Sequence, residues 1–173
     1  MRSLGLLMLE GMCACATGTP APAPSRVETA ELVGELKPYS FLLGTWDAEG
    51  GGSPGASAGR FTFEADVQGH VLVRRNVSST PKGKHEDLVV LYVAEPGVVR
   101  ASYFDNEGHV IQYGVRALDS PPGAEFVTAE GTGGPRFRLT NLRTSDDTLL
   151  VRFEVAPPGG AFRTYLEGTA RRR

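Results

Sequence analysis

From residue 44 onward, apolar and polar residues alternate along most of the chain with a period of two. Between residues 61 and 67, Phe, Phe, Ala and Val alternate with Thr, Glu and Asp, which is the pattern of a strand with one buried face. Clusters of Gly, Pro, Asn or Asp separate such runs and are typical of tight turns. The pattern predicts ten strands, over 44–51, 59–68, 70–79, 86–95, 97–105, 109–118, 124–130, 135–143, 147–156 and 160–170.

A single helix is predicted ahead of these strands. Residues 25–28 carry the serine and glutamate of a capping box, a common start of a helix. Leu32, Val33 and Leu36 then follow at helical spacing and form one apolar stripe. Pro38 is expected to end this helix, because the residue before a proline is biased away from helical geometry.

Ten consecutive strands joined by tight turns favour an up-and-down antiparallel sheet. Closing such a sheet into a barrel removes its two exposed edges. A sandwich is the competing architecture, but it usually needs longer crossover connections. We therefore expect an all-β fold, a ten-stranded antiparallel up-and-down β-barrel with a short N-terminal helix.

The first residues differ from the rest of the chain. Arg2 precedes a short apolar stretch over 4–9, and the segment 14–16 reads Ala-Cys-Ala, a small-residue cleavage pattern. These features predict a secretory signal over 1–16, hence a periplasmic or secreted protein. Lipid attachment at Cys13 or Cys15 and an unstructured tail are the alternatives.

The predicted signal is followed by a Pro/Ala-rich linker over 17–26 and a single barrel domain over 27–173. Both cysteines of the chain lie within residues 1–16. If that segment is removed, the domain has no cysteine for a disulfide, a thiolate nucleophile or a zinc site.

Composition narrows the function classes further. The 173 residues have 18 basic and 20 acidic side chains and a net charge of −2, without the concentrated basic face of a nucleic-acid-binding protein. There is no apolar run of the length of a transmembrane helix. We expect a monomer or homodimer with a small-molecule partner and no nucleic-acid partner.

One sequence motif lies at the entry to the first strand. Residues 36–46 read Leu-Lys-Pro-Tyr-Ser-Phe-Leu-Leu-Gly-Thr-Trp. Gly44 permits close approach of a neighbouring chain, and Trp46 supplies a large rigid side chain that can plug the base of a barrel. This stretch resembles the opening of calycin-type barrels, in particular the nitrobindin-like and fatty-acid-binding-protein-like branch and its uncharacterised bacterial relatives.

The resemblance also raises the question of haem. The haem proteins of that branch bind iron through a histidine in the C-terminal part of the barrel, whereas the last histidine here is His109. Ala48 also replaces the middle glycine of the nitrobindin-like Gly-x-Trp-x-Gly-x-Gly pattern. Tyr165 is the alternative iron ligand, since tyrosine can bind ferric iron. We expect no cofactor, with haem on an atypical ligand as the alternative.

Candidate ligand-binding residues come from strand faces. Arg75 shares one face of its strand with three valines, and Arg74 shares the other with Leu72. An inward arginine in a small barrel can bind a carboxylate with its planar fork. Tyrosines on three consecutive strands can line one wall, depending on the register. The predicted ligand-binding residues are Arg75, Tyr92, Tyr103 and Tyr113.

Catalytic chemistry has less support in the sequence. The three histidines, His70, His85 and His109, are expected in solvated turns, and their spacing is not that of a zinc site. Asp105 and His109 could meet across a hairpin as an acid–base pair. We predict an exported, lipocalin-like barrel that binds a small hydrophobic or amphipathic molecule without catalysis. An enzyme using the barrel cavity for acid–base chemistry is the alternative.

Overall fold

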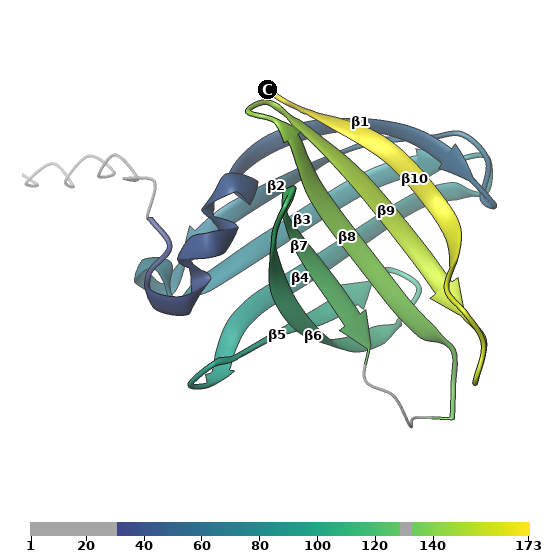
Figure 1. Ribbon diagram of the computed structural model, residues 1–173. Helices are drawn as coiled ribbons and strands as arrows, with labels where there is room; N and C mark the ends of the chain where they lie inside the picture. The colour runs from purple at the N-terminus through teal and green to yellow at the C-terminus, as the bar shows by residue number, and fades with distance from the viewer. Residues whose placement is uncertain (1–30, 129–132) are drawn as a thin grey trace, which may run out of the picture.

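The computed structural model describes residues 31–128 and 133–173, which form a closed barrel of ten antiparallel strands (Figure 1). Each strand pairs with the next in sequence, and β10 pairs with β1. The predicted ten-stranded up-and-down barrel is therefore confirmed. The strands are β1 Gly44–Gly52, β2 Ser57–Asp66, β3 Val71–Thr80, β4 Gly83–Glu95, β5 Val98–Asp105, β6 Val110–Asp119, β7 Pro122–Thr128, β8 Arg136–Ser145, β9 Thr148–Ala156 and β10 Arg163–Arg172.

The strand boundaries agree with the sequence pattern because turn residues delimit most strands. The strand ends that can be compared lie within three residues of the predicted ones. The predicted end of the seventh strand, at 129–130, lies outside the described residues. So do the predicted signal over 1–16, the linker over 17–26 and the capping box over 25–28.

The helix differs from the prediction. A 3₁₀ helix, η1, spans Gly34–Leu42 and contains Pro38 in its interior, so the expectation that the proline ends the helix is wrong. Its buried residues, Leu36, Tyr39 and Leu42, recur every third position. A 3₁₀ helix has three residues per turn, so this spacing places all three on one face. Their burial outweighs the one backbone hydrogen bond that proline cannot donate.

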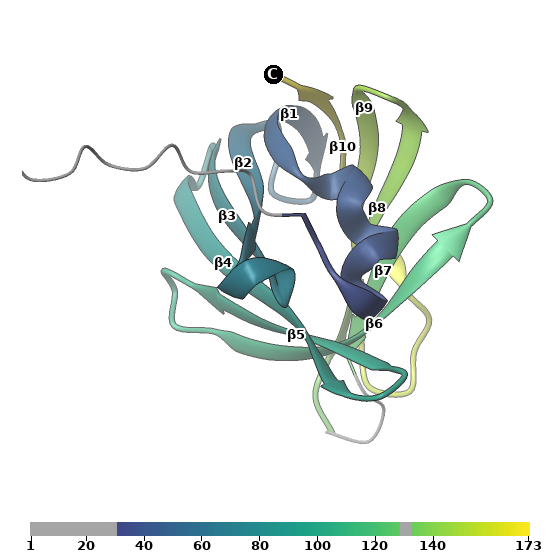
Figure 2. The same cartoon turned by 90° about the vertical axis from the view of Figure 1, so that its left-hand side faces the viewer.

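This helix lies across one end of the barrel (Figure 2). The amide of Val33 donates to the carbonyl of Gly69, at the end of the short 3₁₀ turn η2 (Val67–Gly69), at 3.1 Å. The Glu35 carboxylate accepts from the amide of Gly97, in the β4–β5 turn, at 3.0 Å. These bonds tie η1 to two turns of the barrel. We call this end the covered end and the half of the barrel away from η1 the far half.

The core occupies the barrel interior and continues beneath η1. Trp46, Phe61 and Phe63 pack together there, with Trp46 and Phe61 ring centroids 6.4 Å apart. On the opposite wall, Tyr113 packs edge-to-face against Phe126. None of the helices in the described residues is long and apolar enough to span a membrane. The buried apolar residues of the core are Leu32, Leu36, Tyr39, Leu42, Trp46, Phe61, Phe63, Leu72, Val89, Leu91, Ala101, Tyr113, Ala124, Phe126, Leu149 and Ala170.

Candidate functional site

At the covered end, the interior is closed by Trp46. This side chain has no exposed surface, and its indole Nε1–H donates to the carbonyl of Leu42 at 2.8 Å. The Arg172 guanidinium lies over the indole ring, 4.2 Å from its centroid, and donates to the carbonyls of Phe41 and Leu43. Trp46 therefore holds the end of η1, and Arg172 holds Trp46 and the chain that joins η1 to β1.

Gly44 permits this arrangement. Its φ is +120°, a backbone conformation that favours glycine. A Cβ atom at this position would lie 2.6 Å from Nη1 of Arg172. The structure thus places the two residues of the sequence motif, Gly44 and Trp46, at the covered end, where Gly44 gives Arg172 the room to reach the backbone.

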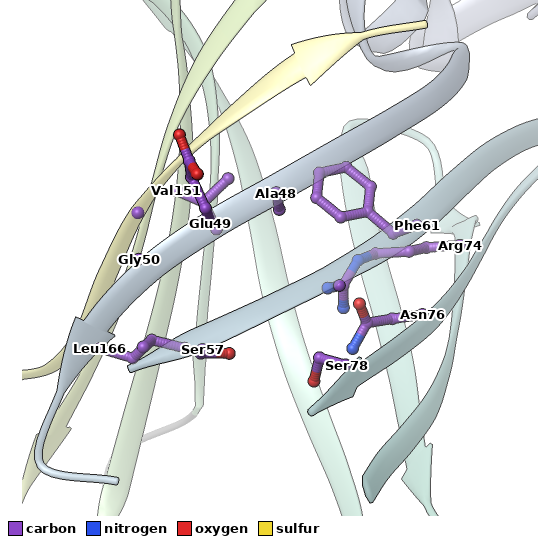
Figure 3. A pocket seen from close by; sticks show the side chains of 12 residues that line it. Ala48, Glu49, Gly50, Ser57, Phe61, Arg74, Asn76, Ser78, Val151 and Leu166 are labelled. Atoms are coloured by element: carbon purple, nitrogen blue, oxygen red, sulfur yellow. The ribbon is translucent and has the colours of Figure 1, made fainter. Parts of the chain in front are cut away.

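The far half contains a cavity of about 90 Å³ (Figure 3). Gly50 of β1 and Gly168 of β10 are directly opposite each other in its wall. A Cβ atom would lie only 2.3 Å from a carbonyl oxygen of the other strand at Gly50 and 2.5 Å at Gly168. The two glycines therefore allow a close approach that side chains would prevent. The residues that line the cavity are Ala48, Glu49, Gly50, Ser57, Gly59, Phe61, Arg74, Asn76, Ser78, Val151, Leu166 and Gly168.

The cavity has a polar wall and an apolar wall. Arg74, Asn76 and Ser78 alternate along the inward face of β3 and form the polar wall (Figure 3). Val151 of β9 and Leu166 of β10 form the apolar wall. Phe61 of β2 lies beside the polar wall, directly opposite Asn76 in the β2–β3 ladder. The Arg74 guanidinium lies 5.0 Å from the centroid of the Phe61 ring. A bound molecule would therefore meet hydrogen-bonding groups on one side and hydrocarbon on the other.

Asp87 of β4 holds the polar wall in place. Its Oδ1 accepts from Nη1 of Arg74, and its Oδ2 accepts from Nδ2 of Asn76, each at 2.7 Å. The Arg74 and Asp87 side chains are only 12% and 4% exposed, so this ion pair is screened little by solvent. The carboxylate orients the two side chains that line the cavity without lining it itself.

A hydrogen-bonded chain continues from Asp87 toward the β5–β6 turn. Nε2 of His85 lies 3.4 Å from Oδ2 of Asp87 and 3.1 Å from the Tyr103 hydroxyl. The Tyr103 hydroxyl donates to Oδ2 of Asp105 at 3.1 Å, so its oxygen is left to accept from His85. Oδ2 of Asp105 is also 2.9 Å from Nδ1 of His109. We call His85, Tyr103, Asp105 and His109 the relay residues.

Burial and charge set the protonation states of this cluster. Burial raises the pKa of Asp87, but the Arg74 charge and the hydrogen bonds from His85 and Asn76 outweigh it, so the pKa is lowered overall. The hydrogen bond to Asp87 is the main cause of the raised pKa of His85. Burial raises the pKa of Tyr103, and the nearby carboxylates of Asp87 and Asp105 raise it further. At neutral pH, Asp87 is therefore charged and Tyr103 is a neutral donor.

The structure separates the four predicted ligand-binding residues into two groups. Tyr103 and Tyr113 are on inward-facing positions, and Tyr113 is buried. Tyr92 and Arg75 are on the outer face, where Arg75 is exposed. The inward arginine of β3 is Arg74 instead. Ligand binding by any of these side chains stays a prediction, and of the four predicted residues none lines the cavity.

The register explains the residues that sequence reasoning missed. Arg74 and Asn76 have the same parity as the buried Leu72 on β3, and Asp87 has the same parity as the buried Val89 on β4. Taking Leu72 instead of the three valines as the guide to the core would have turned Arg74 inward. The single leucine is the better guide to the inward face, because a barrel leaves valines partly exposed on its outer surface.

The three histidines lie in different environments. His70 is exposed and follows η2, as expected of a turn residue. His85 was expected in a solvated turn, but it belongs to β4 and its side chain is 29% exposed, because the alternation of β4 carries it to the interior beside Asp87. His109 is 62% exposed and does meet Asp105, whose Oδ1 also accepts from the amides of Glu107 and His109.

The residues of the cavity do not fit haem. The lining side chains include no His, Cys, Met or Tyr, the types that hold haem iron. Tyr165, the alternative iron ligand, packs edge-to-face against Phe153 instead. Within 31–128 and 133–173, no group of three or more His, Cys, Asp or Glu side chains is placed to hold a metal ion.

Comparisons with known proteins support the fold. No protein-family model matches the sequence, and no curated protein matches it. The barrel is similar to the crystal structure of Rv2717c from M. tuberculosis, with a TM-score of 0.61 and 18% identity over 83% of this chain and 99% of that one. It is also similar to the S-type phycobiliprotein lyase CPES from Guillardia theta, with a TM-score of 0.50 and 10% identity over 78% and 90%. These likenesses show a shared barrel fold.

Proposed function

We propose that this protein is a lipocalin-like barrel of the calycin type, related to the nitrobindin-like and fatty-acid-binding-protein-like branch, that binds a small hydrophobic or amphipathic molecule without catalysis. The observation that carries the proposal is the cavity of the far half, with its polar wall on β3 and its apolar wall on β9 and β10. Function is argued from this site because one barrel fold serves many activities.

The cavity volume limits what enters it. About 90 Å³ corresponds to roughly three water molecules at ~30 Å³ each. Pockets for drug-sized ligands usually exceed about 300 Å³. The ligand is therefore a small molecule, or one end of a longer molecule whose remainder lies outside the cavity.

The arrangement of titratable groups supports binding over catalysis. The relay residues are hydrogen-bonded to one another, and none of the four lines the cavity. A general base must come within hydrogen-bond reach of the substrate. The one lining carboxylate, Glu49, is an exposed residue of β1 whose parity is opposite to that of the inward Trp46 and Ala48. The inward polar side chains of the cavity include Arg74, Asn76 and Ser78, which are groups that recognise and orient a molecule.

One buried donor lies close to this cavity. Asn141 of β8 is 2% exposed, and its Nδ2 has no hydrogen-bond partner among the described residues. Asn141 is directly opposite Val151 in the β8–β9 ladder. An unpaired buried donor is stabilised by an acceptor oxygen, so a ligand that carries one near the apolar wall would be favoured.

We also propose that the protein is exported to the periplasm or beyond. This rests on the sequence of residues 1–16, whose apolar stretch and Ala-Cys-Ala segment are typical of a signal peptide. Lipid attachment at Cys13 or Cys15 would instead anchor the barrel to a membrane through the Pro/Ala-rich linker.

Native mass spectrometry of the full chain expressed in bacteria tests both parts. We expect the protein mass to show loss of residues 1–16 and a small molecule to remain bound. Val151→Phe fills the cavity and should remove the bound mass. Leu150→Phe, one residue away on the outer face of β9, is the matched control and should retain it.

Two outcomes would contradict the proposal. A bound mass that persists in Val151→Phe would show that the ligand binds elsewhere. A protein that carries no small molecule and gains none from a lipid or metabolite extract would leave binding without support. An unprocessed N-terminus would refute export independently of the ligand result.

A further inference from the structure

The charge of Arg74 is already balanced. Its Nη1 donates to the Asp87 carboxylate at 2.7 Å, and the two side chains are 12% and 4% exposed. An incoming carboxylate that binds the remaining guanidinium N–H groups would lie within a few ångströms of the buried Asp87 charge. Repulsion between like charges is strong where solvent is excluded, so Asp87 cancels much of the attraction that Arg74 offers.

The charges farther along the chain of hydrogen bonds add to this repulsion. Asp105 of β5 is directly opposite Asp87 of β4, and Glu107 of the β5–β6 turn lies 3.7 Å from Nδ1 of His85. The pKa of His85 is raised, so His85 in its protonated form is a second cation beside Arg74. The carboxylates of Asp87, Asp105 and Glu107 face the same region. Even with His85 protonated, these five groups carry a net charge of −1.

The polar wall suits an uncharged group. Nδ2 of Asn76 donates one hydrogen bond to Asp87, and its Oδ1 can accept one. The Ser78 hydroxyl can donate or accept, and the rest of the Arg74 guanidinium donates. A carboxylate only accepts, whereas an amide or hydroxyl group both donates and accepts, so it matches this mixture of partners.

We propose that the cavity selects molecules whose inserted end is an uncharged hydrogen-bonding group, such as an amide or a hydroxyl, and rejects the corresponding carboxylate. This inference rests on the proposed function, since it names the ligand class of the same cavity. Asp87 is a positioning residue in it: it contributes counter-charge and orientation and does not touch the ligand.

The test compares hexanamide with hexanoate, which share a chain and differ in the charge of the polar end. Both are titrated at pH 7.5 into the isotopically labelled protein, and the side-chain N–H signals of Arg74 and Asn76 are followed by NMR. We expect hexanamide to bind about tenfold more tightly than hexanoate. Asp87→Asn should remove this preference or reverse it. Asp119→Asn makes the same charge change on the exposed end of β6 and should leave the preference intact.

The outcomes distinguish failure of the inference from failure of the proposed function. Equal or tighter binding of hexanoate to the unaltered protein would overturn the inference and leave the binding barrel standing. An unchanged preference in a folded Asp87→Asn protein would also overturn it. If neither probe shifts the Arg74 or Asn76 signals, the cavity is not a ligand site and the proposed function fails with the inference. The result for the unaltered protein stands even if Asp87→Asn does not fold.

Discussion

Arg172 and Arg74 lie in different halves of the barrel, and each lies over an aromatic ring. At the covered end, Arg172 lies 4.2 Å from the centroid of the Trp46 ring. In the far half, Arg74 lies 5.0 Å from the centroid of the Phe61 ring. The difference lies in where their N–H groups donate. Arg172 donates to the backbone carbonyls of Phe41 and Leu43, and the only carboxylate that an ion pair brings to it among the described residues is that of Asp147, which is 76% exposed. Arg74 donates to the carboxylate of Asp87, which is 4% exposed.

This difference determines what each half can do. Backbone carbonyls carry no net charge, so Arg172 fastens η1 over the barrel without needing a second buried charge. Arg74 depends on Asp87, and Asp87 in turn is shared with Asn76 and His85. The covered end is therefore a filled, apolar closure, and the far half is a polar network around a cavity.

The largest effect is expected for Arg74→Met. The change keeps an unbranched side chain but leaves Asp87 buried without its main counter-charge, which typically costs about 3–5 kcal/mol. We expect the free energy of unfolding at pH 7, measured by chemical denaturation, to fall by that order. Asp87 has a lowered pKa, so its stabilising effect is present above its ordinary value of about 3.9 and is lost as the pH falls below it. The difference between the two proteins should shrink in that acidic range.

Arg75→Met is the matched control for this prediction. Arg75 is the next residue on β3, but it is exposed on the outer face, so its replacement should leave stability nearly unchanged. Equal losses for Arg74→Met and Arg75→Met would show that the ion pair inside the barrel contributes nothing beyond a surface arginine.

A smaller effect is expected for Arg172→Met. The variant loses the cation–π contact and the hydrogen bonds to two carbonyls, together about 2 kcal/mol. It also loses the ion pair with Asp147, which contributes little because Asp147 is 76% exposed. No buried carboxylate is left unpaired, so the loss should be the same at pH 5 and pH 8. Chemical denaturation at both pH values measures it, with the exposed neighbour Arg171→Met as control. A loss that varies strongly with pH would contradict the distinction between the two arginines.

The two halves also differ in how far the sequence predicts them. The motif over 36–46 is enough to single out Gly44 and Trp46, because a large rigid side chain after a glycine has few other uses at the start of a barrel. The partner, Arg172, lies 126 residues after Trp46 in the chain, and only the closure of β10 onto β1 brings them together. Helical periodicity failed for η1 because its buried residues recur every third position, not with the α-helical period.

The residues of the far half could not be predicted from the sequence, because the alternation on β3 did not decide which face points inward. Both arginines of that strand fit one face or the other, and the sequence favoured Arg75 because of its neighbouring valines. Asp87 was missed because an isolated aspartate in a run of polar residues carries no signal of burial. Its role arises only when β3 and β4 pair and place Asn76 directly opposite it.

The smallest effect is expected for His85→Gln. It changes the pH dependence of the free energy of unfolding through a residue of the far half, with no counterpart expected at the covered end. The hydrogen bond to Asp87 raises the pKa of His85, so protonated His85 stabilises the fold fully below its ordinary value of about 6.5. That contribution is lost as the pH rises through the raised value of the folded state. The free energy of unfolding should therefore differ between wild type and His85→Gln by about 1 kcal/mol near pH 5.5 and by less at pH 8.5. His70→Gln replaces an exposed histidine near the covered end and should follow the wild type at both pH values. A His85→Gln difference that grows with pH would mean that His85 is held in its neutral form and that Asp87 is stabilised by Arg74 and Asn76 alone.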